Sequence, residues 1–326
     1  TITYTVSNGP CTDSDQHVIT VYDNPEPQIS GPVSACINQS TIDFGVNLSG
    51  GSWSGPGIIN VTDGIFDPSV AGTGNHQIVF TISNGNCLAF DTHNITVNNT
   101  TNLSITNADT EFCLNEPSVV VVVSPAGGVL SGNGITGNQF NPAAAGIGTH
   151  TITYSYTNLN GCSSVVTKLF TVHALPVASF SGINNHYCLN DGSSVLVGLP
   201  AGGVFSGDGI GGSTFNPQTA GTGMHEIIYV YTDGFGCRDT AEYTTIVYLV
   251  PEVTTDNLTE PLCYGNANGS IYISVSSGLS PYSYTWSNTP SSTTQDLLNV
   301  VAGNYSVTVS DSRGCTHVAQ FNLLQP

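Results

Sequence analysis

The sequence predicts an all-β protein: a tandem array of small immunoglobulin-like antiparallel β-sandwich modules. One observation is a glycine-rich string that returns three times, as GGSWSGPGI from Gly50, GGVLSGNGI from Gly127 and GGVFSGDGI from Gly202. A second is that each copy is followed by a segment of the form FxPxxAGxGxH and by an alternating run that leads to a cysteine. A repeat period of about 75 residues is typical of arrays of structural modules.

Alternation at period two indicates one half-buried strand in each module. The four alternating runs are Ile2–Val6, Ile78–Ile82, Ile152–Tyr156 and Ile227–Tyr231. Lysine and methionine are nearly absent, whereas 37 glycines and 17 prolines interrupt the apolar runs, a composition that disfavours helices. We therefore expect sandwiches of about six or seven short strands, with glycines in the turns between them.

Module boundaries are predicted where prolines and polar residues follow a closing strand. The expected domains are 1–26, the C-terminal part of a truncated immunoglobulin-like module; 27–99, 100–176 and 177–251, three complete immunoglobulin-like modules; and 252–326, a module of a different kind. The connections are short and contain no Gly/Ser tract, so we expect neighbouring modules to stack as a stiff rod.

The cysteines follow the repeat. One set opens the modules, namely Cys36, Cys113, Cys188 and Cys263, and another closes them, namely Cys11, Cys87, Cys162, Cys237 and Cys315. No two lie close enough in sequence to form the paired ligands of a zinc site. We expect each opening cysteine to bond to the next closing one, as Cys36–Cys87, Cys113–Cys162, Cys188–Cys237 and Cys263–Cys315. Each bond would stabilise its module by about 4 kcal/mol and indicates an oxidising compartment.

Cys11 is left unpaired by this scheme. It ends the run TITYTVSNGPC, which aligns with the run before Cys162. The first cysteine of its module is therefore expected upstream of Thr1.

The charge balance excludes several classes of partner. Three Lys and Arg residues face 22 Asp and Glu residues, which gives a formal net charge of −19. Such a surface does not neutralise phosphates, so we expect no nucleic-acid partner, and anionic membrane surfaces are disfavoured. The apolar run Val119–Val123 is far too short to span a bilayer, so no direct membrane insertion is expected.

Three phrases distinguish the last module: LCYGNANGSIYISVSSG, SPYSYTWS and VVAGNYSVTVSDSRGC, within residues 262–315. They resemble the SprB repeat of giant surface proteins of gliding Bacteroidota. The three preceding modules resemble the immunoglobulin-like repeats of the same class of exported adhesins. This resemblance implies export by the type IX secretion route and display on the extracellular, bacterial cell surface.

Three histidines occupy the same place in three modules, directly after the AGxG turn: His76, His150 and His225. A metal or pH-sensing role would need further ligands nearby in sequence. We interpret them instead as turn-capping side chains that bond a backbone carbonyl.

Aromatic residues offer a possible glycan platform. Trp53 takes the place of Leu130 and Phe205 in the repeat, so we expect it in a core. Tyr282, Tyr284 and Trp286 alternate along one strand and share one face. We interpret that face as buried, with glycan binding as the alternative.

Metal and modification sites are left open. Asp23 with Glu26, and Glu252 with Asp256, are the acidic pairs placed to hold calcium at module junctions. The sequence Asp239–Thr240–Ala241 resembles the O-glycosylation signal of Bacteroidota, with Thr240 as the acceptor. No grouping of nucleophile, base and orienting residue is present, so we expect no catalytic residue and no enzyme activity.

The sequence thus predicts a non-catalytic segment of a long repetitive cell-surface adhesin or surface filament. It would act as a rigid, disulfide-stapled stalk in surface adhesion or gliding. The expected partners are neighbouring modules of the same chain, with surface glycans or an outer-membrane motility or secretion apparatus as further candidates. The alternatives are the stalk of a secreted enzyme and a carbohydrate-binding module array.

Overall fold

The computed structural model describes residues 1–85 and 87–325. Its regular structure consists almost wholly of strands in small, mainly antiparallel sheets, which confirms the predicted all-β class. The chain divides into two compact units. The first comprises Thr1–Thr110 and Glu116–Val172, and the second comprises Glu111–Asn115 and His173–Pro326.

The first unit begins with a hairpin. Strands β1 (Ile2–Asn8) and β2 (Cys11–His17) pair antiparallel, with Asn8 opposite Cys11. Every residue of both strands is exposed, including the apolar side chains of β1.

The next module contains more and shorter strands than the sequence predicts. Its elements are β3 (Ile29–Ser30), β4 (Ser34–Cys36), β5 (Ile42–Asp43), β6 (Gly45–Val46), β7 (Ser52–Ser54), β8 (Ile58–Asn60), β9 (Ile65–Phe66), α1 (Pro68–Ala71), β10 (Gly74–Asn84) and β11 (Cys87–Asn98). One sheet has the order β4-β11-β10-β7 and another β5-β9-β8. The two enclose a core of aromatic and branched side chains that includes Trp53, which confirms its predicted place.

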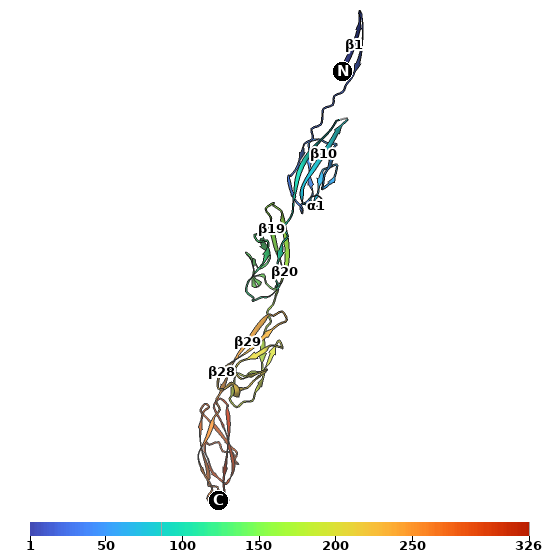
Figure 1. Ribbon diagram of the computed structural model, residues 1–326. Helices are drawn as coiled ribbons and strands as arrows, with labels where there is room; N and C mark the ends of the chain where they lie inside the picture. Colours follow the sequence, from blue (N-terminus) through green and yellow to red (C-terminus); the bar gives the residue numbers. More distant parts are fainter. Residues whose placement is uncertain (86, 326) are drawn as a thin grey trace. The chain divides into compact units, whose positions relative to one another are not determined.

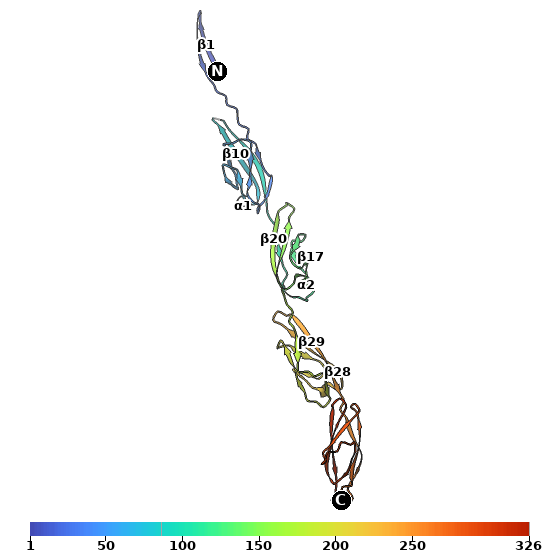
Figure 2. The same ribbon diagram turned by 180° about the vertical axis from the view of Figure 1, so that it is seen from behind.

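The module that follows repeats this plan within the first unit. Its elements there are β12 (Ser104–Ile105), β14 (Val119–Val120), β15 (Val123–Ser124), β16 (Val129–Ser131), β17 (Ile135–Thr136), β18 (Gln139–Phe140), α2 (Pro142–Ala145), β19 (Gly148–Thr157) and β20 (Ser163–His173). The long strands β19 and β20 lie side by side (Figure 1). Viewed from behind, α2 and β17 belong to the same body as β20 (Figure 2).

The second unit contains a third copy of the plan. The elements of this copy are β21 (Ser179–Ser181), β22 (His186–Cys188), β23 (Ser194–Val195), β24 (Val197–Leu199), β25 (Val204–Ser206), β26 (Ile210–Gly211), β27 (Thr214–Phe215), α3 (Pro217–Ala220), β28 (Gly223–Thr232) and β29 (Arg238–Tyr248). The second unit also includes the short strand β13 (Glu111–Cys113), which belongs to the sheet β13-β20-β19-β16 of the preceding module. Its larger sheet has the order β22-β29-β28-β25. The central hairpin of β28 and β29 is prominent in Figure 1.

The last module has a different topology, as its sequence predicts. Its strands are β30 (Glu252–Thr259), β31 (Gly269–Ser276), β32 (Ser283–Trp286), β33 (Leu297–Val300), β34 (Gly303–Ser310) and β35 (Thr316–Leu323). They form two three-stranded sheets, β30-β31-β33 and β32-β34-β35, around a core with Trp286 at 1% exposure.

The repeated FxPxxAGxGxH segment folds the same way in three modules. Each copy forms one helical turn, with an Asp or Asn N-cap, proline at the start and a glycine of positive φ at the end. At the first cap, hydrogen bonds from the Ser69 hydroxyl and amide hold the pKa of Asp67 below its usual value.

The histidine that follows this turn bonds back to the terminal glycine. The Nε2 atoms of His76, His150 and His225 lie 2.8, 2.8 and 2.9 Å from the carbonyl oxygens of Gly72, Gly146 and Gly221. The predicted carbonyl-bonding role is therefore confirmed in all three modules.

Candidate functional site: disulfide-linked module junctions

The disulfides join neighbouring modules, and the predicted pairing within modules is wrong. The bonds are Cys36–Cys162, Cys113–Cys237 and Cys188–Cys315, with sequence separations of 126, 124 and 127 residues. Three opening cysteines, Cys36, Cys113 and Cys188, each skip the closing cysteine of their own module and bond to that of the next module.

The pairing of strands explains why a bond within a module does not form. Strand β4 runs parallel to the last residues of β11, so that Cys36 lies opposite Asn98. Cys87 begins the same strand β11. At a rise of about 3.3 Å per residue, the two cysteines are separated by about 36 Å, whereas a disulfide requires Cα atoms within about 7 Å.

The same register recurs in the third module. Strand β22 runs parallel to β29, with Cys188 opposite Tyr248 at the end of the strand. Cys237 directly precedes the start of β29. The predicted pair Cys188–Cys237 is therefore excluded for the same reason.

A turn with a shared signature presents the closing cysteine of each bond. In the first bond, the Oδ1 atom of Asn158 accepts hydrogen bonds from the amides of Asn160 and Cys162, both at 3.0 Å. Asp233 and Asp311 hold Cys237 and Cys315 in the same way. The signature is Asn or Asp followed four residues later by cysteine, as in NLNGC, DGFGC and DSRGC. This pattern could have been found in the sequence.

Hydrogen bonds surround the first bond, Cys36–Cys162. The amide nitrogen of the Asn38 side chain donates to the carbonyl of Ser163 at 3.0 Å. The Asn158 side chain donates to the carbonyl of Asn99 at 2.9 Å. The hairpin tip of one module is thus fixed to the end of the preceding module's closing strand.

An aromatic stack accompanies the second bond, Cys113–Cys237. The ring of Phe235, on the hairpin tip, stacks on His173 with centroids 3.8 Å apart and planes at 12°. The Nε2 atom of His173 lies 2.5 Å from a carboxylate oxygen of Glu111.

A cation–π contact accompanies the third bond, Cys188–Cys315. The guanidinium of Arg313 lies 4.0 Å from the ring centroid of Tyr248, a geometry that is attractive because the ring face is electron-rich. The Asn190 side chain donates to the carbonyl of Thr316 at 3.0 Å, in the same place as Asn38 at the first bond.

Three cysteines are free in the structure. Cys11 and Cys263 are exposed and Cys87 is half-buried. Cys87 and Cys263 were both expected in disulfides, so these two expectations are corrected. Each junction is built from a disulfide together with hydrogen bonds or ring contacts that join one module to the next.

Peptide mapping checks this connectivity. Under non-reducing conditions we expect three cross-linked peptides, corresponding to the three bonds between modules. Alkylation without reductant should label Cys11, Cys87 and Cys263. A cross-linked peptide joining Cys36 to Cys87 would contradict the connectivity. Because the chain has only three Lys and Arg residues, a protease other than trypsin is required.

The aromatic stripe of the last module faces its core, as expected. Trp286 is 1% exposed and its Nε1 atom donates to the carbonyl of Thr294 at 2.9 Å. Tyr282 and Tyr284 are partly buried against the same core. The stripe therefore packs against the core of the last module, and glycan binding by it stays a prediction.

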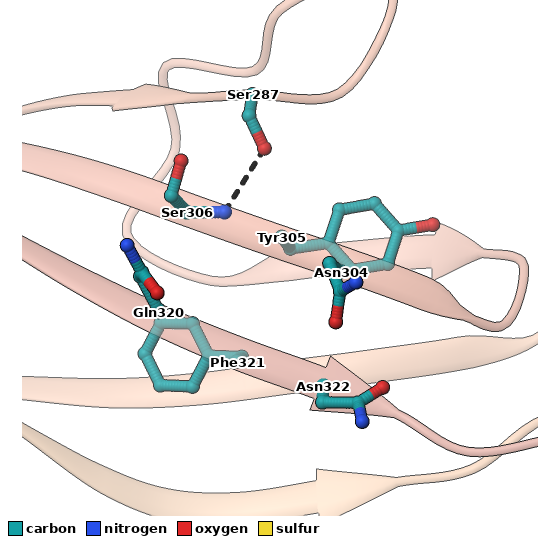
Figure 3. Close-up of a pocket in the computed structure, with 7 residues that line it drawn as sticks. All are labelled: Ser287, Asn304, Tyr305, Ser306, Gln320, Phe321 and Asn322. Carbon is teal, nitrogen blue, oxygen red and sulfur yellow. Dashed lines mark hydrogen bonds between the residues drawn. The ribbon is translucent and has the colours of Figure 1, made fainter.

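A polar pocket of about 430 Å³ lies on the last module. Its lining comes mostly from β34 and β35 and consists of Ser287, Asn304, Tyr305, Ser306, Gln320, Phe321 and Asn322 (Figure 3). The Ser287 hydroxyl accepts a hydrogen bond from the Ser306 amide at 2.9 Å. Burial raises the pKa of Tyr305. These lining residues include no Asp, Glu, Lys, Arg or His, and they offer hydroxyl and amide groups beside the rings of Tyr305 and Phe321.

The predicted acidic pairs are used in other ways. The main-chain carbonyls of Asp23 and Glu26 accept hydrogen bonds from Asn84 and Asn47, and a carboxylate oxygen of Asp256 accepts from Ser274 at 2.6 Å. Glu252 is exposed. Within residues 1–85 and 87–325, no group of three or more His, Cys, Asp and Glu side chains is placed to hold a metal. Calcium at the junctions stays a prediction.

The predicted glycosylation acceptor, Thr240, is exposed on β29. Its neighbour Asp239 accepts a hydrogen bond from the Ala178 amide at 2.7 Å. Amide hydrogen bonds from Ala178 and Thr240 lower the pKa of Asp239. The hydroxyl of Thr240 is accessible, and its modification stays a prediction.

The chain was compared with solved structures. It shares 12% identity and a TM-score of 0.28 with a calcium-stabilised adhesin that helps an Antarctic bacterium bind ice, covering 91% of this chain and 98% of that one. With titin domains I67–I69 the identity is 10%, the TM-score 0.32 and the coverage 69% and 98%. With the N-terminal eight Ig domains of Down syndrome cell adhesion molecule the identity is 12%, the TM-score 0.28 and the coverage 98% and 57%.

Among protein families, the SprB repeat model matches residues 255–290. No curated protein sequence matches the chain. None of the helices in the described part of the chain is long and apolar enough to cross a membrane. The last module therefore contains an SprB repeat, in agreement with the resemblance of its sequence.

Proposed function

We propose that this chain is a load-bearing, non-catalytic stalk segment of a bacterial cell-surface adhesin. The observation that carries the proposal is that all three disulfides connect one module to the next. Bonds within modules would stabilise single modules. Bonds between modules keep each junction closed when the array is pulled, because without them only non-covalent contacts prevent the two modules from separating along the peptide linker.

The disulfides, the modular array and the SprB repeat are all consistent with a load-bearing role on the cell surface. Disulfides of this number persist in an oxidising, extracellular environment. In arrays, stability is approximately the sum of module and interface contributions, so each added junction strengthens the segment. The SprB repeat at residues 255–290 supports a surface location. Export by the type IX route and a part in gliding follow from that resemblance and belong to the proposal.

Attachment of cells under flow tests the function. In the protein that carries this segment, all three bonds are removed by replacing the bonded cysteines with serine: Cys36, Cys113, Cys162, Cys188, Cys237 and Cys315. Attachment at rest should change little, because the modules keep their cores. Retention under shear should fall several-fold, because only non-covalent contacts then keep each junction closed and the modules can separate along their peptide linkers.

The matched control replaces the two exposed free cysteines, by Cys11→Ser and Cys263→Ser, and should behave as the wild type. Amide hydrogen exchange of the variant confirms that the modules remain folded. Unchanged retention under shear, with folded modules, would contradict a load-bearing role for the disulfides.

A further inference from the structure

The N-terminal hairpin carries half of a module core with nothing packed on it. The run TITYTVSNGPC aligns with QIVFTISNGNC of the next module, and HVITV with HNITV. Four apolar side chains of the first segment are exposed: Ile2 60%, Tyr4 70%, Ile19 52% and Val21 87%. The matching residues of the next module are buried: Ile78 0%, Phe80 2%, Ile95 1% and Val97 2%.

The junction between this half-module and the next is already partly formed. The Asn84 side chain donates to the carbonyl of Asp23 at 2.8 Å. At the first disulfide-linked junction, Asn158 donates to the carbonyl of Asn99 at 2.9 Å. Asp23 aligns with Asn99, so the two hydrogen bonds are equivalent. The tip of the β10–β11 hairpin therefore occupies the position that places a closing cysteine at a junction.

The repeat also shows what should lie beside Tyr22. Tyr22 aligns with Asn98. In the complete module, Cys36 lies opposite Asn98 on the parallel strand β4, and the amide of Ile37 donates to the Asn98 carbonyl at 2.9 Å. Cys36 bonds from there to Cys162 on the next hairpin tip. The corresponding cysteine on the next hairpin tip here is Cys87, a free and half-buried thiol.

We propose that residues 1–23 and Cys87 form a binding surface for the opening half of a module of the same repeat class, joined in the same chain. Its first strand would run parallel to residues 18–22 and place a cysteine opposite Tyr22. That cysteine would bond to Cys87, with loss of two hydrogens to an oxidant of the extracellular thiol–disulfide pool. The apolar side chains of the added half would cover Tyr4 and Val21. This inference goes beyond the stalk function, because it identifies a specific covalent partner.

One difference in register bears on the proposal. Cys87 is the first residue of β11 and lies opposite Asn84. Cys162 instead directly precedes its strand β20, within the turn held by Asn158. The equivalent hydrogen bonds of Asn84 and Asn158 keep both tips at the junction despite this shift, so the thiol of Cys87 stays at the boundary between modules.

A fusion tests the proposal with a segment taken from this chain. A copy of residues 100–150 is placed before Thr1, so that its terminal GTH continues into TITYTV as it does into TITYSY in the natural repeat. We expect a disulfide between the added copy of Cys113 and Cys87. Alkylation without reductant should then label Cys11 and Cys263 but no longer Cys87.

Two controls separate bonding from folding. In the fusion carrying Cys87→Ser, amide exchange of residues 2–21 should still be at least tenfold slower than in the original chain, because the core is completed without the bond. Rapid exchange in both fusions would overturn the proposed partner. An alkylated Cys87 in the folded fusion, or a bond between the added cysteine and Cys11, would overturn the proposed bond.

The original chain provides a third test. If the surface accepts a second copy instead, the oxidised chain should form dimers linked through Cys87, and this result would also overturn the proposal. A monomer with an alkylated Cys87 supports it.

Discussion

With its three disulfides intact and a load applied to its two ends, the chain is expected to extend to no more than about 260 Å. The shortest covalent path runs from Thr1 to Cys36, across to Cys162, on to Cys188, across to Cys315 and on to Pro326. It contains about 70 peptide links of about 3.5 Å each. The reduced chain should extend to about 1,100 Å, because all its residues then lie on the path.

Paired substitutions give this prediction a matched control. Replacing Cys113 and Cys237 with serine should leave the maximum extension unchanged, because the shortest path does not use that bond. Replacing Cys36 and Cys162 with serine should lengthen the maximum extension to about 600 Å. The shortest path then runs from Thr1 to Cys113, across to Cys237, back to Cys188, across to Cys315 and on to Pro326. Single-molecule force spectroscopy, with handles at both ends, measures all three extensions.

The experiment also separates the two possible pairings. Bonds within modules would leave two more connecting segments on the path, from Cys87 to Cys113 and from Cys237 to Cys263, and give about 430 Å. An oxidised chain that reaches this length, or an effect of the Cys113 and Cys237 substitutions equal to that of Cys36 and Cys162, would contradict the interlinked arrangement.

Interlinking has a mechanical consequence for the proposed stalk. The loops from Cys36 to Cys162 and from Cys188 to Cys315 lie off the shortest path. Unfolding inside these loops therefore cannot add their length to the segment. A stalk built this way would keep its reach under loads that unfold single modules.

The sequence predicted most of the fold because its signals are local. The alternating runs mark β10, β19 and β28, and the segment FxPxxAGxGxH specifies a capped helical turn together with the histidine that bonds to it. Trp53 could be placed in a core because Leu130 and Phe205 occupy the same repeat position. Each of these inferences depends on residues within one module.

The cysteine pairing could not be predicted in the same way. It depends on β4 pairing in parallel with the end of β11, which is a long-range contact without a local signal. Sequence order suggested that each opening cysteine bonds to the next closing cysteine along the chain. In the structure those two cysteines lie at opposite ends of one long strand, as Cys36 and Cys87 do on β11. The turn signature of NLNGC, DGFGC and DSRGC marks the closing cysteine of each bond between modules. The last module shares this signature although its topology differs.

Replacing Trp286 with alanine is expected to lower the free energy of unfolding of the last module by about 3–5 kcal/mol, the usual cost of truncating a buried tryptophan. Trp286 is 1% exposed and lies 5.6 Å from Phe321 between ring centroids. Its indole also satisfies the carbonyl of Thr294, which would lose its partner at a further cost of about 1–3 kcal/mol if it remained buried. A change of this size is a large part of the total stability of about 5–15 kcal/mol that domains usually have.

Amide hydrogen exchange of β31, β34 and β35 measures the effect without relying on the fluorescence of the residue that is removed. The matched control is Thr285→Ala, since Thr285 is exposed on the same strand and its loss should change stability by less than about 0.5 kcal/mol. Exchange in residues 27–99 should be unchanged, because that core belongs to the first unit. A loss below about 1 kcal/mol for Trp286→Ala would contradict the central place of this side chain in the core. Equal losses in residues 27–99 would instead show that the modules unfold together, so that the disulfides couple their stabilities as well as their positions.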